Sequence, residues 1–351
     1  MSSSDFNLDG FLSSVAVDSD DPVRSLTPGT DLPSGIPWSE PGYEGKIDYR
    51  IRQLSYSSLT TLHSCPRKFQ LYRLKTSHRT EEALTSTITF SYGHVVGEAI
   101  QLALEGLEED EIIWRMFCMW HTPELWDADT KGAKSIWEAI IALQRFLSLR
   151  SNGFLEDYEL VYYKGKPACE LSFCIRFPDG FRLRGFVDAV LRHRVSGAVI
   201  VLECKTTGLA TVNPATYKNS AQAIGYSIVL DVLYPELSSY EVLYLVYQTK
   251  TREYLPIPFT KTYLQRALWI RELLLDIETI KMYEEAEVYP MRGESCVAFF
   301  RDCEYLQTCT LSTEYLTRTC QEEDQDTTEY QIDLTLQDLL EAQFRKSEHI
   351  S

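Results

Sequence analysis

The chain has 351 residues, 44% of them hydrophobic and 24% charged, so it has enough apolar material for the core of one large or two small globular domains. No stretch approaches the ~18 continuous apolar residues of a transmembrane helix, so no membrane span is predicted. The net charge of −17 excludes a generally basic nucleic-acid-binding surface, but residues 1–50 carry −6 and residues 321–351 carry −7, which leaves the middle only mildly acidic.

The two ends of the chain differ from its middle in composition. Residues 1–50 are rich in Ser, Asp, Pro and Gly and lack hydrophobic periodicity, which predicts a disordered acidic leader without a secretory signal. Nine irregularly spaced cysteines then favour a reducing, cytoplasmic location, where such clusters are more often metal ligands than disulfides. Residues 51–320 are expected to form one domain and residues 321–351 an acidic tail, with a short helix near 334–344.

The first predicted helix covers residues 55–74 and carries the densest basic stretch of the chain. Ser57 or Ser58 is the expected N-cap, and Pro66 is expected to restart the helix after Cys65. Two interpretations of the basic side chains stay open, a solvated helix face and a phosphate-contacting surface. The residues concerned are Arg67, Lys68, Arg73 and Lys75.

A second predicted helix spans residues 90–104, opens with Tyr92, Gly93 and His94, and carries Glu98 near its start. Tryptophan-rich helices follow. Their helical spacing favours core positions over platforms on which bases stack. These tryptophans are Trp114, Trp120, Trp126 and Trp137.

Three β-type runs at residues 168–177, 181–191 and 198–205 predict an antiparallel meander. The apolar run of residues 199–202 predicts a strand buried on both faces. Alternation then places Glu203 and Lys205 on one face, and hairpin pairing brings Asp188 beside Glu203. Two carboxylates beside an amine suit Mg²⁺ or Mn²⁺. The alternative is a solvated strand face, because Glu-x-Lys is common in proteins.

The rest of the middle region predicts a crossover back to the same sheet. A helix at residues 214–233 carries Gln222 and Tyr226 four apart, hence on one face. Strands are expected at 240–248 and 253–258, and a long helix at 262–283.

Taken in order, these motifs resemble the PD-(D/E)XK nuclease superfamily in its RecB-like branch. That branch includes nuclease domains of helicase–nuclease complexes, CRISPR spacer-acquisition nucleases and many phage exonucleases. The resemblance covers about residues 54–310. It rests on Cys-Pro-Arg-Lys-Phe at 65–69, a glycine-rich helix start, Gly-x-x-Asp at 185–188, Glu-x-Lys at 203–205 and Gln-x-x-x-Tyr at 222–226.

The resemblance implies an α/β, restriction-endonuclease-like fold, a mixed β-sheet flanked by helices. It implies Asp188 and Glu203 as ligands of Mg²⁺ or Mn²⁺, Lys205 as the catalytic lysine, and Gln222 and Tyr226 as the motif behind the active site. The implied activity is that of a phage-like, metal-dependent DNA exonuclease in recombination, repair or processing. Its partners would be DNA and, among proteins, a recombinase or a single-strand-binding protein.

One position departs from the family pattern. The branch usually has Gly-x-x-x-His on the helix that contains Gly93, and here Gly97 occupies the histidine position. Glu98 is a candidate substitute metal ligand, with His94 as a weaker one, although adjacent helix residues point about 100° apart. The alternative function is therefore a DNA-end-binding or scaffold protein with little or no cleavage.

Family members with an iron–sulfur cluster have one cysteine before the nuclease core and three after it, and four thiolates suit a [4Fe–4S] cluster. Here six residues separate the first two C-terminal cysteines, against two in the family, so Cys320 is a possible replacement for the first of them. Zinc and unliganded thiols stay open as alternatives. The quartet is Cys65, Cys296, Cys303 and Cys309.

Overall fold

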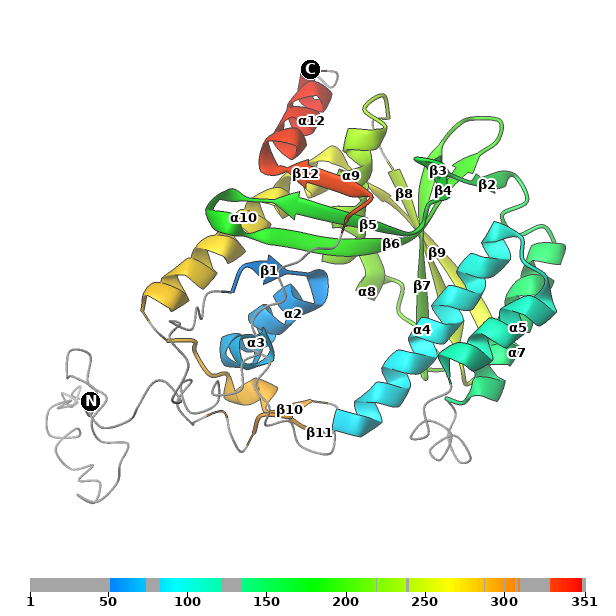
Figure 1. Cartoon of the computed structure of the whole chain (residues 1–351), viewed down its shortest axis with the longest axis horizontal. Helices are drawn as coiled ribbons and strands as arrows, with labels where there is room; N and C mark the ends of the chain where they lie inside the picture. The colour runs from blue at the N-terminus through cyan, green and yellow to red at the C-terminus, as the bar shows by residue number, and fades with distance from the viewer. Residues whose placement is uncertain are drawn as a thin grey trace, which may run out of the picture. The chain divides into compact units, whose positions relative to one another are not determined.

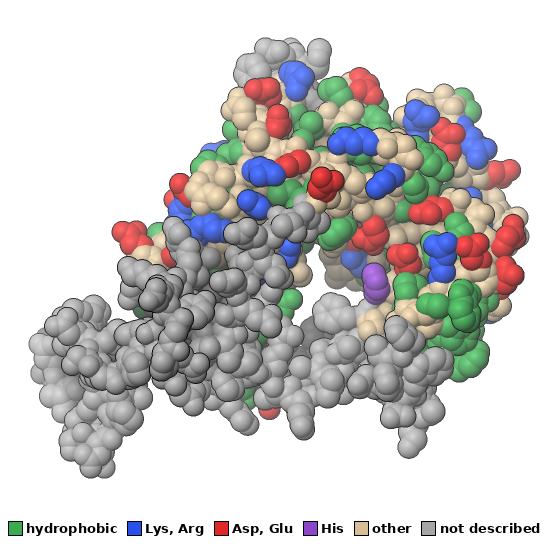
Figure 2. Space-filling model, viewed as in Figure 1, with side chains coloured by type: hydrophobic (Ala, Val, Ile, Leu, Met, Phe, Trp, Pro, Cys, Tyr) green, Lys and Arg blue, Asp and Glu red, His purple; other side chains and the backbone are tan. Residues whose placement is uncertain are grey.

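The computed structural model describes residues 51–73, 83–120, 134–218, 220–237, 240–286, 288–298, 301–306, 309 and 329–348. The predicted leader, residues 1–50, lies outside them. No helix among these residues is both long enough and apolar enough to cross a membrane. Figure 2 shows basic and acidic side chains interspersed over the coloured part of the face in view.

A central mixed sheet organises the described part of the chain, with strand order β12-β5-β6-β7-β8-β9. Neighbouring strands from β5 to β7 are antiparallel, β7 and β8 are parallel, and β8 and β9 are antiparallel. The strands are β5 (Cys169–Arg176), β6 (Arg182–His193), β7 (Val199–Thr207), β8 (Tyr240–Gln248), β9 (Glu253–Lys261) and β12 (Ile332–Thr335), with β1 (Gln53–Leu54) and β2 (Tyr158–Leu160) also paired to β6. This mixed sheet with helices against it confirms the predicted fold class.

Helices cover both faces of the sheet and bury two hydrophobic clusters, one on each face. Alternation along β8 shows the division, because Val242 and Tyr244 pack in one cluster while Leu243 and Leu245 pack in the other. Figure 1 shows α4, α5 and α7 gathered together. The helices are α2 (Tyr56–Ser64), α3 (Pro66–Arg73), α4 (Ala83–Glu105), α5 (Glu109–Met119), α7 (Ile136–Ser151), α8 (Ala215–Lys218), α9 (Ala221–Leu233), α10 (Tyr263–Glu285) and α12 (Leu336–Glu348).

The short turns of the meander form where the sequence predicts them. A 3₁₀ turn at Pro178–Gly180 joins β5 to β6, with Asp179 in the left-handed region at φ 60°. Gly197, at φ 71°, closes the β6–β7 turn and donates its backbone N–H to His193 O at 2.9 Å. These turns fix the register of the strands that carry the candidate site.

The predicted helix at residues 214–233 is divided into α8 and α9, which connect β7 to the parallel strand β8. This is the expected crossover. The chain after α10 contains a 3₁₀ turn at Gly293–Ser295 and a small hairpin of β10 (Val297–Ala298) and β11 (Arg301–Asp302). A second small hairpin joins β3 (Tyr162–Tyr163) to β4 (Lys166–Pro167).

The first helix begins differently from the prediction. Its N-cap is Ser55, whose hydroxyl accepts from Ser58 N, while the Ser58 hydroxyl accepts from Ser55 N in a capping box. The prediction of Ser57 or Ser58 as the cap was wrong, because Ser58 is the N3 partner of the cap. The restart at Pro66 is confirmed, since Cys65 is extended and α3 begins at the proline.

The tryptophans divide between core and surface. Trp120 is completely buried, whereas Trp114 and Trp137 are 69% and 61% exposed. The assignment of the tryptophans to the core is thus correct for Trp120 and wrong for the other two, since α5 and α7 bury other faces. Trp126 lies outside the described residues.

The segment expected to be an acidic tail is part of the packed unit over residues 329–348. β12 extends the sheet beside β5, and α12 packs against α9 and α10. A fully buried ion pair joins Arg266 of α10 to Asp231 of α9, and Gln343 of α12 donates to the other Asp231 oxygen at 2.8 Å. The short helix predicted near residues 334–344 is present as α12, and the alternating apolar residues Ile332 and Leu334 of β12 are buried despite the net negative charge of the segment.

Candidate active site

The β6–β7 hairpin brings Asp188 and Glu203 to facing positions. The paired register ends at Ala189 opposite Leu202, so the next positions along the two strands are Asp188 and Glu203. The backbone N–H of Cys204 donates to Asp188 Oδ2 at 2.8 Å. The structure therefore brings together the two carboxylates that the sequence places on one face of the hairpin.

A chain of polar contacts runs from Glu203 to the helix α9. Glu203 is completely buried and forms an ion pair with Lys205 Nζ. Lys205 Nζ also donates to Gln222 Oε1 at 3.3 Å, and Gln222 Nε2 donates to Tyr226 Oη at 2.6 Å. Both ends of the Gln222 amide are used, and turning it over would place its NH2 group against the Lys205 ammonium and lose that bond. These contacts connect Glu203, Lys205, Gln222 and Tyr226. Asp188, the remaining residue of the predicted catalytic set, faces Glu203 across the hairpin.

The carboxylates lie in an environment that opposes their negative charge. Burial, and next the charge of Glu203, raise the pKa of Asp188 well above its ordinary value. Burial also raises the pKa of Glu203, with Lys205 acting in the opposite direction. Burial alone would lower the pKa of Lys205, but attraction to Glu203 and Asp188 outweighs it and raises that pKa. A cation bound beside the two carboxylates would offset the free-energy cost of burying their negative charge.

The donor set fits a divalent ion in one further respect. Glu203 Oε2 is buried and has no hydrogen-bond partner among the residues that the structure describes. Oxygen ligands of this kind are what Mg²⁺ and Mn²⁺ prefer. Within the described ranges, no three His, Cys, Asp or Glu side chains form a complete metal-holding group. The protein thus supplies two oxygen-ligand residues, and water or substrate would supply the others.

Tyr56, at the start of α2, is a site residue that the sequence interpretation missed. Burial and next the charge of Glu203 raise the pKa of its hydroxyl well above the ordinary value, and that hydroxyl has no hydrogen-bond partner among the described residues. Its ring lies over the backbone of Gly225 and edge-on to Tyr226, at 5.5 Å between centroids. Only a residue without Cβ leaves room for this ring on α9.

Glu170 is a third carboxylate near the pair, and it too was missed. It lies on β5 at the position opposite Asp188, between the paired residues Cys169–Ala189 and Leu171–Val187. Its φ of 45° is left-handed, and its charge raises the pKa of both Asp188 and Glu203. The register of the β5–β6 hairpin, counted from its turn at residues 178–180, would have placed Glu170 opposite Asp188.

The predicted metal ligand Glu98 lies near Glu170. Burial and next Glu170 raise the pKa of Glu98, His94 acts in the opposite direction, and neither Asp188 nor Glu203 is among the charges that shift it. On the same helix an ideal Cβ at Gly93 would lie 3.6 Å from Thr206 Oγ1, while one at Gly97 would meet nothing within 4 Å. Gly97, at the family's histidine position, therefore lies one helical turn after Gly93, on the helix face that contacts β7. A side chain there would enter open space.

The predicted cysteine quartet lies in one neighbourhood without a complete ligand arrangement. Burial raises the pKa of the Cys309 thiol, Arg67 acts against it, and the thiols of Cys296, Cys65 and Cys303 raise it further. Cys303 N donates to Cys296 O at 2.7 Å across the base of the β10–β11 hairpin. As stated above, no three of the described side chains close on a common metal position.

Two of the four predicted DNA-binding basic residues, Arg67 and Lys68, contact the C-terminal segment that carries Cys303 and Cys309. Arg67 is 8% exposed and donates from Nε to Cys309 O at 3.1 Å and from Nη1 to Gln70 Oε1. Lys68 pairs with Glu304 at 3.7 Å. Arg67 is therefore neither on a solvated face nor on an open phosphate surface, because it holds the C-terminal segment against α3. Arg73 ends α3, and Lys75 lies outside the described residues.

The model of the PD-(D/E)XK nuclease superfamily matches residues 53–310. The chain belongs to this superfamily. Membership implies nucleic acid as the substrate class and phosphodiester hydrolysis as the reaction class, and the superfamily typically uses divalent metal ions. No curated protein matches the chain. A solved structure titled "Crystal structure of SSO0001" is similar at 14% identity and a TM-score of 0.29, over 65% of this chain and 76% of that one, which is too distant to support any inference.

Proposed function

We propose that the chain is a metal-dependent DNA exonuclease of the RecB-like branch, acting in recombination, repair or DNA processing. The observation that carries the proposal is the convergence of Asp188, Glu203 and Lys205, with one Glu203 oxygen buried and unpartnered within the described structure. A structural ion pair alone would not need a second carboxylate facing the first. Asp188 and Glu203 would hold Mg²⁺ or Mn²⁺.

When bound, such an ion polarises a phosphate and lowers the pKa of its water. The protein's own contribution centres on Lys205. Lys205 would stabilise charge on a phosphate oxygen, or orient or deprotonate the attacking water. Gln222 limits where the ammonium can lie, and Tyr226 fixes the Gln222 amide. Glu170 would add negative charge, and so affinity for a cation, at the same place.

The alternative is a DNA-end-binding or scaffold protein with little or no cleavage. It is favoured by Gly97 in the family's histidine position and by the lack of a third closing ligand among the described residues. End-labelled single- and double-stranded DNA, incubated with Mg²⁺ or Mn²⁺ and with EDTA as control, separates the two. The nuclease proposal expects metal-dependent shortening from an end. Binding without any shortening would favour the scaffold.

We further propose a [4Fe–4S] cluster held by Cys65, Cys296, Cys303 and Cys309. The number and kind of donors fit, and support comes from Cys303 and Cys309, which pack against the same small buried cluster of Leu71 and Tyr305. A cluster here would connect the start of α3 to the C-terminal segment. Protein purified without oxygen should be brown and contain iron and sulfide in near-equal amounts. Zinc alone, or neither metal, would contradict the cluster without affecting the nuclease proposal.

A further inference from the structure

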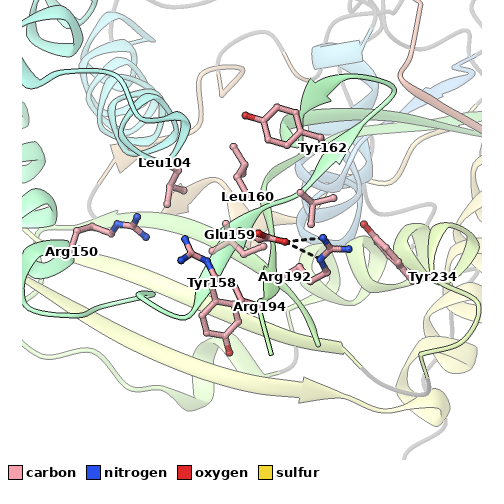
Figure 3. A pocket seen from close by; sticks show the side chains of 11 residues that line it. Leu104, Arg150, Tyr158, Glu159, Leu160, Tyr162, Arg192, Arg194 and Tyr234 are labelled. Atoms are coloured by element: carbon pink, nitrogen blue, oxygen red, sulfur yellow. Dashed lines mark hydrogen bonds and ion pairs between the residues drawn. The ribbon is translucent and has the colours of Figure 1, made fainter. Parts of the chain in front are cut away.

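A pocket of about 480 Å³ lies where β2 and the end of β6 meet residues of α4 and α7 and the residue after α9. Figure 3 shows arginine and tyrosine side chains around it, drawn from segments far apart in the sequence. None of them belongs to the candidate active site. The polar lining residues used below are Arg150, Arg192, Arg194, Tyr158, Tyr162 and Tyr234.

The pocket carries positive charge on a strongly acidic chain. Arg192 is neutralised, because it forms a two-pronged ion pair with Glu159 at 2.8 and 3.3 Å. Glu159 is the one acidic residue among the described residues that line the pocket. Arg150 donates only to the carbonyl of Leu155, at 3.5 Å, and Arg194 has no side-chain ion pair within the described structure. Two guanidinium charges are therefore left without an acid.

Arg150 and Arg194 also act on each other. Burial, and next the charge of Arg194, lower the pKa of Arg150, although a guanidinium remains charged. Holding two cations together costs free energy unless an anion lies between them. A phosphate group matches a guanidinium in geometry and offers enough oxygens for two of them. The tyrosines can pack against a sugar or a base, since Tyr162 is 65% exposed at the edge.

We propose that this pocket binds a phosphate group of the nucleic-acid strand whose reacting phosphate lies at Asp188 and Glu203. The inference rests on the proposed nuclease function for the identity of the strand. Arg192 follows Asp188 by four residues on the same strand, which is about 14 Å at roughly 3.4 Å per residue. A segment of only a few nucleotides spans that distance.

The test is binding of fluorescein-labelled single-stranded DNA of 12 nucleotides to the full chain in EDTA, followed by anisotropy. Arg150→Ala/Arg194→Ala should weaken binding of this 12-mer by about tenfold for each arginine. The slope of log affinity against log salt should fall by about 0.7, because the variant loses one phosphate contact and each such contact with a single strand contributes about 0.7. A merely structural role would not change that slope.

A control of equal charge change is Arg271→Ala/Arg345→Ala, since both arginines are exposed on α10 and α12. Equal 12-mer affinity in the two double variants would overturn the proposal. If the double pocket variant does not fold, Arg194→Ala alone, at an exposed position, should still weaken binding of the 12-mer by about tenfold.

Free phosphate compounds form a separate arm, with inorganic phosphate and deoxyadenosine monophosphate as probes. Arginine-dependent thermal stabilisation by these probes, without any effect on the 12-mer, would overturn the assignment to a strand in favour of a free nucleotide. All binding is measured without divalent metal. If the wild-type protein does not cleave DNA in the separate assay with Mg²⁺ or Mn²⁺, the nuclease proposal fails. The comparison of binding between the arginine variants remains valid.

Discussion

Gly225→Ala tests whether the contact between α2 and α9 holds the site in place. An ideal Cβ at Gly225 would lie 1.8 Å from Tyr56 Oη and 2.6 Å from Tyr56 Cζ, far inside an ordinary contact of 3.4 Å or more. The Tyr56 ring cannot move aside without displacing other side chains, because the rings of Phe173, Tyr226 and Trp269 surround it with centroids 5.5 to 6.3 Å away. We expect the substitution to displace Tyr56 and to separate α2 from α9.

Gly97→Ala, the same substitution on α4, is the control that isolates the loss of stability caused by the contact of Gly225→Ala with Tyr56. Both glycines lie in helices, where alanine gains about 0.5–1 kcal/mol over glycine. Because Gly97 has nothing within 4 Å of its ideal Cβ, that variant should show the gain alone. The difference between the two variants is then the overpacking term, about 1–3 kcal/mol, with Gly225→Ala the less stable.

Urea denaturation followed by circular dichroism measures both free energies of unfolding, and cleavage of labelled DNA measures the consequence for activity. Gly225→Ala should also cleave more slowly, since Tyr56 lies beside Glu203. Two variants of equal stability would show that the Tyr56 ring does not rest on Gly225, and would remove Tyr56 from the site.

Three further outcomes are expected. Asp231→Ala should cost about 3–5 kcal/mol in urea denaturation, because it removes the carboxylate that pairs with the buried guanidinium of Arg266; a loss below 1 kcal/mol would contradict the buried network. Without metal, the contribution of Asp188 and Glu203 to stability should be fully present below the ordinary carboxyl pKa values and be lost as the pH rises through their raised values; the difference in unfolding free energy between wild type and Glu203→Gln across a pH series measures it, and a pH-independent difference would contradict it. Gly97→His should tighten Mn²⁺ binding in calorimetry, since its Cβ enters open space beside β7; unchanged affinity would show that the position faces elsewhere.

The sequence is sufficient for the parts of the site that depend on local pattern. The β6–β7 hairpin follows from an apolar run and a turn at Gly197, and strand alternation then places Glu203 and Lys205 on one face. Gln222 and Tyr226 share a helix face because they are four apart. Each of these inferences spans fewer than about forty residues.

Contacts between distant segments were less predictable. Tyr56 meets Gly225 across about half the length of the chain, and nothing in the local pattern at residue 56 signals it. The strand β12 has a visible alternation, with Ile332 and Leu334 buried, but its partner β5 lies far back in the sequence, so the acidic composition was given more weight. Arg67 was misjudged for the same reason, because its partner Cys309 is 242 residues away.

The most direct test of the nuclease proposal is the cleavage rate of Glu203→Gln in saturating Mg²⁺ or Mn²⁺, measured beside Glu278→Gln. The control makes the same chemical change at an exposed glutamate of α10 that pairs with Lys281. We predict that Glu203→Gln loses about 10²-fold or more of the wild-type rate while folding normally and that the control keeps it. Equal rates in the two variants would contradict the assignment of the active site to the β6–β7 hairpin.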